Sequence, residues 1–445
     1  MRRNTLLLSL AGLIVVGGLV ALGVVGWMVL QPGPYGFAKG TKVALADYKG
    51  PSPTGLPAEL AKADAATRGE YIARMADCEA CHTAKGGTPF AGGRAFVLPF
   101  GTIYTPNITP DAETGIGTWT DAQFLNAVHR GIAPDGSRYY PAFPYPSYTL
   151  LTDEDTLAIK SYLFSLAPVK QANKPNTFGF PYNQRWLMAI WATLFNPDTR
   201  FQPVDGQSPE WNRGAYLVEA AGHCGECHTP RNLMQALDQR HKFGGGVAEG
   251  WNAYNISADA VSGIGDWSAD ELAAYLSAGH AKGRGSASGP MGEAVDLSLS
   301  HLTASDIDAI VTYVRTVPPV AGNLPRLAGS APATPRLAGL DNPIGQRVFQ
   351  GNCASCHGWT GAGAVRDEAG LTGVRAVNDP SGANVALMVL HGSGGVWPGH
   401  PLMPAFGKAY SNAEVAAVAN YVTARFGAVP STLSPDDVAK LRAME

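Results

Sequence analysis

The stretch Cys78-Glu79-Ala80-Cys81-His82 recurs in pattern as Cys224-Gly225-Glu226-Cys227-His228 and as Cys353-Ala354-Ser355-Cys356-His357. These three stretches contain all six cysteines of the chain. The pattern C-x-x-C-H attaches c-type haem, because two thiols bond the porphyrin edge and the adjacent histidine reaches the iron. A redox dithiol, a structural disulfide and a zinc site need no histidine after the second cysteine. The sequence therefore predicts three covalently bound haems.

The haem-binding groups follow from this pattern. The predicted thioether bonds form at Cys78, Cys81, Cys224, Cys227, Cys353 and Cys356. One axial position of each iron is assigned to His82, His228 or His357. The spacing suits one helical turn per motif, which places both sulfurs and the imidazole against the same porphyrin.

The second axial ligand sets the potential of a haem and decides whether its iron is open to other molecules. Met403 opens the loop Met403-Pro404-Ala405-Phe406-Gly407, and Met291 follows Gly289 and Pro290. These two methionines are the predicted ligands of haems three and two. The corresponding loop of the first repeat reads Tyr140-Pro141-Ala142-Phe143, and phenylalanine cannot bind iron.

Haem one therefore lacks the methionine that the other two repeats offer. No methionine lies between His82 and Met188, and His129 is the one further histidine of the first repeat. We name His129 as the candidate sixth ligand. An open iron and a methionine from elsewhere, such as Met188, are the alternatives.

The first two motifs lie in a duplicated unit. Asn107-Ile108-Thr109 recurs as Asn255-Ile256-Ser257, and Trp119 recurs as Trp267. Both pairs stand at the same offset of 148 residues (255 − 107; 267 − 119), which indicates duplicated domains rather than a solenoid. We predict a mainly α fold of three tandem class I cytochrome c domains with long loops, plus an N-terminal transmembrane helix.

The predicted division of the chain follows the motifs and the changes in composition. It runs 1–30 (transmembrane anchor), 31–62 (extended tether), 63–170 (first domain), 171–210 (inter-domain segment), 211–318 (second domain), 319–343 (proline-rich linker), 344–430 (third domain) and 431–445 (C-terminal tail). In small class I cytochromes c a glycine of the first helix packs against an aromatic residue of the last. Gly69 and Tyr162 fit that arrangement, and Thr152 is the expected N-cap of a helix over 153–166.

The N-terminus predicts the compartment. Arg2 and Arg3 precede an uncharged run over 5–30, which as a helix would be roughly 39 Å long and could span a hydrocarbon core of about 30 Å. A cleaved signal peptide is the alternative, with Ala44-Leu45-Ala46 as a small-residue cleavage site. We expect a retained anchor in the inner membrane with the bulk facing the periplasm, by the positive-inside rule.

The rest of the composition narrows the function. The net charge is −3 and no basic stripe indicates a nucleic-acid surface. Neither a Rossmann glycine motif nor a nucleophile elbow is present, which agrees with a chain that carries electrons rather than transforming a substrate. The aromatic run from Trp186 to Phe195 predicts either packing between domains or a patch that contacts the membrane or a quinone.

The chain resembles the triple-haem cytochrome c subunits of membrane-bound bacterial alcohol, aldehyde and sugar dehydrogenases. The resemblance covers roughly 65–430, and its departure is Phe143, where the family often has methionine. It rests on Gly69-Glu70-Tyr71, Ala91-Gly92-Gly93, Asn107-Ile108-Thr109-Pro110-Asp111, Tyr140-Pro141-Ala142, Asn183-Gln184-Arg185-Trp186-Leu187-Met188, His228-Thr229-Pro230-Arg231 and Met403-Pro404-Ala405-Phe406.

The resemblance implies an electron-transfer subunit with three covalent haems and a separate catalytic dehydrogenase subunit. That partner would be a quinoprotein, a flavoprotein or a molybdenum enzyme, with a small subunit as a further candidate. Electrons would pass to ubiquinone or a terminal oxidase. The alternative is a haem enzyme, in which an open iron at haem one acts on peroxide or another small ligand.

Overall fold

The computed structural model describes residues 2–98, 100–322, 341–393 and 403–444, and in the N-terminal helix it describes side chains only at residue 13 and from residue 15 onward. This described part is mainly helical, and its short strands pair in two-stranded antiparallel ribbons. The ribbons pair β1 (Thr41–Lys42) with β4 (Val204–Asp205), β2 (Ala95–Leu98) with β3 (Gly101–Tyr104), β5 (Gly246–Ala248) with β6 (Trp251–Ala253) and β7 (His280–Ala281) with β8 (Gly285–Ser286).

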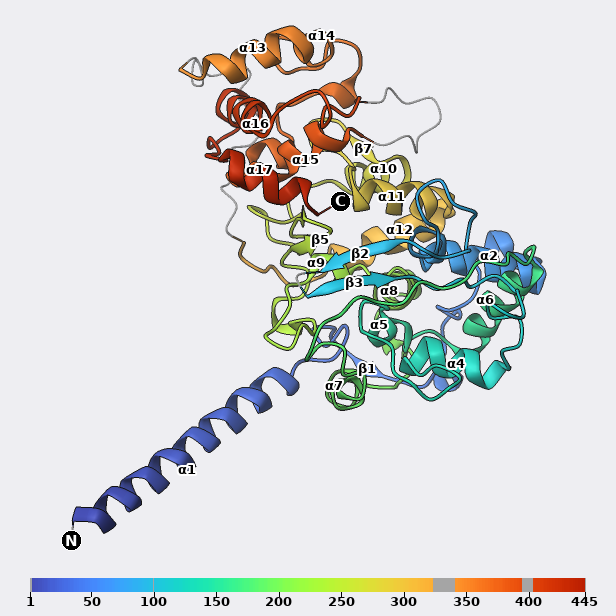
Figure 1. The fold of residues 1–445 in the computed structure, drawn as a ribbon. Helices are drawn as coiled ribbons and strands as arrows, with labels where there is room; N and C mark the ends of the chain where they lie inside the picture. The colour runs from blue at the N-terminus through green and yellow to red at the C-terminus, as the bar shows by residue number, and fades with distance from the viewer. Residues whose placement is uncertain (1, 99, 323–340, 394–402, 445) are drawn as a thin grey trace.

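Three pairs of crossed helices organise the body of the molecule (Figure 1). They are α2 (Ala65–Met75) with α6 (Asp153–Ser165), α8 (Pro209–Tyr216) with α12 (Ala304–Val314), and α13 (Pro343–Asn352) with α16 (Asn412–Phe426). The other helices are α1 (Arg2–Val29), α3 (Cys78–His82), α4 (Asp121–Arg130), α5 (Tyr145–Tyr148), α7 (Leu187–Phe195), α9 (Gly225–His228), α10 (Ala269–Ala278), α11 (Pro290–Leu297), α14 (Ala354–His357), α15 (Ala383–His391) and α17 (Pro435–Arg442).

A glycine sits at each of the three crossings. A Cβ added to Gly69 would overlap the carbonyl of Ala158, and its distance to Tyr162 Cβ would be only 2.9 Å. Gly214 and Gly345 have the equivalent position at the other two crossings. A Cβ on Gly214 would overlap the Ala309 carbonyl of α12, and one on Gly345 the Ala417 carbonyl of α16. The expected contact of Gly69 with Tyr162 is thus confirmed, since only a residue without a side chain lets the two backbones approach this closely.

Side-chain caps fix where the long helices begin. Thr152 accepts a hydrogen bond from the backbone N–H of Asp155, and three acidic residues occupy the first turn of α6. Carboxylates in the first turn interact favourably with the positive end of the helix dipole. The predicted helix over 153–166 is confirmed and ends one residue earlier, at Ser165.

Two large hydrophobic cores and one small apolar cluster hold the described residues together. The larger contains buried side chains from Tyr35 to Val317, so the first two helix pairs share it. The second runs from Val348 to Val438 and belongs to the C-terminal region alone. Figure 1 shows that region, in orange and red, standing beside the shared body. The domain boundaries stay a prediction. The segment 171–210 between the first two predicted domains contains α7 and β4 and packs against the body.

The segment 31–62 corrects the expectation of an extended tether. Its strand β1 pairs with β4, and Tyr35 is 2% exposed with its ring 5.1 Å from that of Phe201. The backbone N–H of Gly55 donates to Asp155 Oδ2 at 2.9 Å. The segment packs on the body because its aromatic ring and backbone groups find buried partners there, which composition alone does not reveal.

The N-terminal helix α1 projects away from the body (Figure 1). The predicted span over 5–30 falls partly on residues 1–12 and 14, whose side chains lie outside the described part. Among the residues that the structure describes, no helix is long and apolar enough to cross a membrane. The anchor stays a prediction. Most of the predicted linker 319–343 also lies outside the described residues, which stop at 322 and resume at 341.

Candidate haem-binding sites

Each C-x-x-C-H motif forms the short helical turn that its spacing predicts. These turns are α3, α9 and α14, and each ends at the motif histidine. No two of the six cysteines are joined in a disulfide. Within the described ranges, no cluster of three or more His, Cys, Asp or Glu side chains is arranged to hold a metal ion.

Each of the three motif histidines makes the same kind of hydrogen bond, from its ring Nδ1 to a backbone carbonyl. His82 Nδ1 lies 2.8 Å from the carbonyl oxygen of Pro106, and His228 Nδ1 lies 2.6 Å from that of Tyr254. His357 Nδ1 lies 2.6 Å from the carbonyl oxygen of Ala369. A carbonyl can only accept, so Nδ1 must carry the proton and Nε2 keeps its lone pair. This orientation by a backbone carbonyl is typical of metal-binding histidines.

Burial keeps these groups uncharged. It lowers the pKa of His82, His228 and His357 below the ordinary value for histidine, partly offset by the carbonyl hydrogen bond. Burial also raises the pKa of Cys78 to about 12 and that of Cys353 to about 11. Neutral imidazoles beside paired thiols, which are half-buried except for the exposed Cys356, fit a covalently attached haem, for which the imidazole must offer a free lone pair.

The repeated asparagines explain how the first two carbonyls are held. Asn107 Nδ2 donates to Val169 O at 2.7 Å, and its Oδ1 accepts from the backbone of Thr109. Asn255 makes the same pair of contacts, donating to Val320 O at 2.7 Å. Each asparagine directly follows the residue whose carbonyl receives the motif histidine. The sequence repeat marked these positions, but their role in orienting His82 and His228 emerges only from the fold.

The two predicted methionine ligands lie in different settings. Met291 is in the first turn of α11, packs partly buried against the shared core, and belongs to a helix that contacts α3. Met403 is partly buried against the C-terminal core, where its backbone N–H donates to Ser393 Oγ at 2.9 Å. Their roles as ligands stay predictions, and residues 394–402 beside Met403 lie outside the described part.

The first repeat has Phe143 at the position of the methionine loop. Its ring centroid lies 5.6 Å from that of Tyr148 and 5.8 Å from that of Tyr139. Met188, the alternative donor, is partly buried in the small apolar cluster of Tyr145 and Trp191 to which Phe143 also packs. The structure therefore brings Met188 close to the loop that lacks a sulfur.

His129 occupies the face of α4 that points away from the shared core. Phe124 and Val128 pack into that core, whereas His129 lines an outer cleft with Leu125 and Asn126. Its Nε2 lies 2.8 Å from Thr156 Oγ1, and its ring is 1% exposed. Its Nδ1 lies 3.6 Å from Asp153 Oδ1, so the described contacts of both ring nitrogens lie outside the haem motifs. The helical period agrees with this arrangement: Phe124 and Val128 are four residues apart and share one face of α4, and Leu125 and His129 share another.

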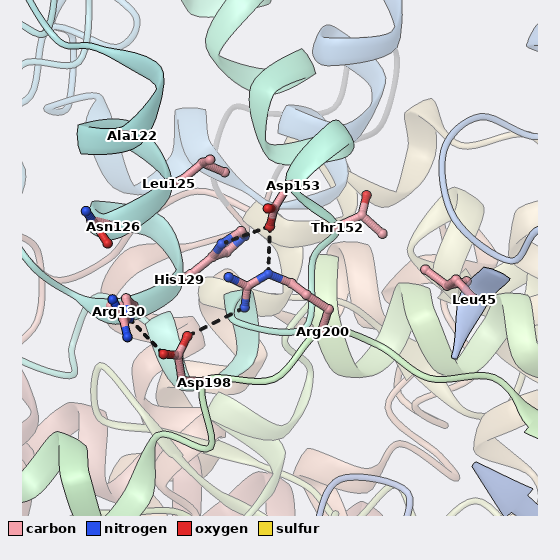
Figure 2. A pocket seen from close by; sticks show the side chains of 10 residues that line it. All are labelled: Leu45, Ala122, Leu125, Asn126, His129, Arg130, Thr152, Asp153, Asp198 and Arg200. Atoms are coloured by element: carbon pink, nitrogen blue, oxygen red, sulfur yellow. Dashed lines mark hydrogen bonds and ion pairs between the residues drawn. The ribbon is translucent and has the colours of Figure 1, made fainter. Parts of the chain in front are cut away.

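The outer cleft has a volume of about 680 Å³ and a charge-balanced wall (Figure 2). Arg200 donates to Asp153 Oδ1 at 2.8 Å, and Arg130 donates to Asp198 Oδ2 at 2.7 Å. Burial, together with the positive charge of Arg200, lowers the pKa of His129 to about 4. His129 is therefore neutral at physiological pH and joins α4 to α6 through Thr156.

Close contacts connect the first motif to the second. The hydroxyl of Tyr148 donates to Ala76 O at 2.5 Å, two residues before Cys78. The same ring lies 5.3 Å from the ring of His223, which directly precedes Cys224. The two haem-binding turns are thus neighbours within the shared core.

Arg94 forms a second connection between these repeats. Its Nη1 donates to Ala80 O at 2.6 Å and to Glu293 Oε1 at 2.7 Å, and its Nη2 donates to Glu249 Oε1 at 3.0 Å. Glu293 lies two residues after Met291 on α11. Sequence reasoning missed this residue because Glu249 and Glu293 are 155 and 199 positions away and no local pattern announces the contact.

The C-terminal core attaches beside the second motif. Tyr254, whose carbonyl receives His228, donates through its hydroxyl to Asp379 Oδ2 at 3.1 Å. Asn252 Nδ2 donates to the same oxygen at 2.8 Å, and Asn384 Nδ2 donates back to Asn252 O at 3.0 Å. The second motif therefore has described contacts toward both of the other haem-binding regions.

These features agree with the known proteins that the chain matches. The family model "Cytochrome c" matches residues 66–167 and 344–425. The gluconate 2-dehydrogenase cytochrome c subunit of Pantoea cypripedii is 40% identical over 400 residues, covering 85% of this chain and 89% of that protein. This chain belongs to the cytochrome c subunits of bacterial dehydrogenases. The predicted family and its mainly helical cytochrome c fold are confirmed.

Two further relatives of this cytochrome c subunit bear on its function. The alcohol dehydrogenase (quinone) cytochrome c subunit of Gluconobacter oxydans is 36% identical over 396 residues, covering 84% of this chain and 81% of the relative. A diheme cytochrome c-type protein of Cereibacter sphaeroides is 39% identical over 263 residues, which is 57% of this chain and 86% of that protein. Association with a dehydrogenase and an electron-transfer role therefore hold for this chain at the level of its family.

Proposed function

We propose that this chain carries three covalent haems and relays electrons from a catalytic dehydrogenase subunit to a membrane quinone. The observation that carries the proposal is the threefold recurrence of one arrangement. In each copy a helical turn presents two thiols, and a neutral histidine is fixed through Nδ1 by a backbone carbonyl. Bound haem supplies one-electron transfer at iron, and the protein sets its potential through axial ligand and burial.

The role of the chain's own residues is to orient and space the three groups. The carbonyls of Pro106, Tyr254 and Ala369 hold the imidazoles in one tautomer. Met291 and Met403 would supply the second ligands of haems two and three. The Tyr148–His223 contact and the Tyr254–Asp379 hydrogen bond support an order in which haem two lies between the others.

The partner and the acceptor follow from the relatives. One relative is named as the cytochrome c subunit of a gluconate dehydrogenase and another as that of an alcohol dehydrogenase (quinone). We infer a partner that is a quinoprotein, a flavoprotein or a molybdenum enzyme, with a small subunit as a further member of the complex. Ubiquinone is the proposed acceptor, and alcohols, aldehydes and sugars are the proposed substrate classes.

The proposed location is the inner membrane, with the bulk of the chain in the periplasm. Leu13, Leu19 and Leu22 of α1 are each at least 63% exposed, and the helix carries no charge after its two initial arginines. An apolar surface of this kind favours a lipid environment. Covalent attachment of haem also requires export of the chain to the outer face of that membrane.

The test uses the full-length protein in detergent, isolated with its attached partner. Partner identification comes from cofactor analysis of the copurified subunit. For electron relay, the haems are reduced chemically and mixed with a water-soluble ubiquinone analogue in a stopped-flow spectrometer. We expect reoxidation of all three haems, and haems that stay reduced in excess quinone would overturn the proposed acceptor.

A second function has one observation in its favour. Phe143 cannot bind iron, and His129 is held by Thr156 on the outer face of α4. If Met188 does not bind either, the iron of haem one is open, and the chain could act on peroxide or a similar small ligand. Addition of cyanide or carbon monoxide discriminates the two, because a six-coordinate haem one would show no spectral response.

A further inference from the structure

One end of the molecule exposes an unusual set of large apolar side chains around α7. Phe180 is 82% exposed, Tyr182 52%, Trp186 63% and Ile190 51%. Leu233, which is 86% exposed, lies in the adjoining loop. Exposed apolar residues are common singly, but Trp186 and Ile190 are four residues apart and so share one face of α7, and a group of this kind marks an interaction surface. We name these five residues the α7 patch.

The buried face of α7 is fixed by packing and by one hydrogen bond. On the opposite side of α7, Trp191 is buried against Tyr145 and Ala236, with ring centroids 6.1 Å apart for the two aromatics. The indole N–H of Trp191 donates to Met234 O at 2.8 Å, which ties α7 to the loop that carries Leu233. Ile190 and the N-cap residue Trp186 are therefore held outward by a packed helix, and Leu233 directly precedes the residue whose carbonyl that helix contacts.

The same loop reaches the base of α1. Arg240 Nη2 donates to Leu30 O at 2.7 Å, and its guanidinium lies 4.5 Å from the ring centroid of Trp27. The backbone N–H of Gln239 donates to Gln31 Oε1 at 2.6 Å. Thus 231–240 contacts α7 at one end and the exit of the apolar helix at the other. Figure 1 shows α7 beside the point where α1 leaves the body.

The charge distribution of this surface suits a lipid headgroup region. Residues 175–197 contain Arg185 and no aspartate or glutamate. Aromatic side chains prefer the interface between water and hydrocarbon, and arginine is attracted to the negative surface of anionic lipids. A lipid-binding patch must lie beside the helix that enters the membrane, whereas a patch that binds a soluble partner protein could lie anywhere on the surface.

We propose that the α7 patch lies in the membrane interface and fixes the tilt of the haem-binding body against the lipid surface. This inference rests on the proposed membrane attachment, and it adds a second contact that is independent of α1. The aromatic run from Trp186 to Phe195 has two interpretations from its sequence, domain packing and membrane contact, and each holds for different residues. Trp191 serves packing, whereas Trp186 and its exposed neighbours serve the lipid contact.

The test uses the full chain with haem, reconstituted in vesicles of phosphatidylethanolamine and phosphatidylglycerol. A photo-reactive residue is placed by Trp186→p-benzoylphenylalanine, by Leu233→p-benzoylphenylalanine and, as the matched control, by Trp359→p-benzoylphenylalanine. Trp359 is also a tryptophan, is 54% exposed, and belongs to the C-terminal region. An unchanged haem spectrum verifies the fold of each variant. We expect several-fold more lipid adduct at positions 186 and 233 than at 359.

Equal adduct yields at 186 and 359, with the chain bound to the vesicles, would overturn the α7 patch while leaving the membrane attachment standing. A chain that fails to sediment with the vesicles would overturn both. Irradiation in native membranes supplies the remaining outcome: if position 186 crosslinks to another protein instead of lipid, the patch is a subunit interface and the lipid proposal is wrong.

Discussion

The first two haem-binding turns share a hydrophobic core, whereas the third turn lies in a core of its own. The difference is not one of local design, because all three turns present the same thiol pair and the same carbonyl-held histidine. It lies in what surrounds them. Tyr148 and Arg94 connect the first two turns directly, while the C-terminal core is joined to the second repeat through polar contacts at Asp379. We conclude that the first two haem-binding turns are coupled structurally, and that the third can change independently.

Removing a haem should break this comparison most strongly. Cys224→Ala with Cys227→Ala should destabilise the shared core by about 5 kcal/mol, at the upper end for large-to-small core substitutions, because Cys224 packs against the core that both repeats share. The spectrum of haem one should change as well. Cys353→Ala with Cys356→Ala should leave haems one and two unaltered. Haem content and thermal unfolding check both variants, and an unperturbed haem one in the first variant would argue against coupling.

The helix crossings offer a finer version of the same test. Gly214→Ala should cost about 3 kcal/mol or more, since its Cβ would overlap the Ala309 carbonyl. We expect it to disturb haems one and two, and Gly345→Ala to disturb haem three alone. Gly351→Ala is the matched control on α13, because its Cβ meets nothing within 4 Å. That substitution should be neutral or slightly stabilising. Urea unfolding followed at each haem band measures these effects.

The predicted methionine ligands sharpen the comparison at the iron. Met403→Ala should produce a five-coordinate or misligated haem three while the haem stays attached, because the thioether bonds at Cys353 and Cys356 remain. The lost packing should cost about 2–3 kcal/mol. Met291→Ala should do the same at haem two. Absorbance near the sulfur–iron charge-transfer band reports ligation. Loss of the haem itself would mean that the methionine acts in folding rather than in tuning.

The smallest expected effect concerns His129. Its pKa is lowered to about 4 by burial and by Arg200, whereas the unfolded value is near the ordinary 6.5. Between these values the unfolded chain binds the extra proton, so native stability falls as the pH falls from 6.5 toward 4. His129→Gln should remove this loss, about 2 kcal/mol at pH 5, and change nothing at pH 8.

The spectrum of that variant carries a separate result. Because His129 lies on the outer face of α4, His129→Gln should leave all three haem spectra unchanged. A high-spin haem one in this variant would instead show that His129 is its ligand. Unfolding curves at the two pH values and one absorption spectrum are sufficient for both comparisons.

Much of the fold could be predicted from local signals. The haem-binding turns, the crossing of Gly69 with Tyr162 and the start of α6 after Thr152 each depend on residues close in sequence or on a repeated pattern. The outer position of His129 was also within reach, since Phe124 and Val128 mark the core face of its helix.

The remaining features depend on contacts that only tertiary structure creates. The carboxylates of Glu249 and Glu293 meet Arg94 across two repeats, and no sequence period connects them. The docking of Tyr35 on Phe201 turned an expected tether into part of the core. In the candidate sites, the thiols and histidines were evident from spacing, but the carbonyl that orients each histidine lies in a loop whose path the sequence does not specify.

The most direct test of the central claim is the intact mass of the purified, denatured chain after noncovalent haem has been extracted. The account predicts a mass that exceeds the polypeptide by three haem groups, falling to two in each Cys→Ala pair variant. A wild-type mass with fewer than three attached haems would contradict the threefold arrangement on which the proposed relay depends.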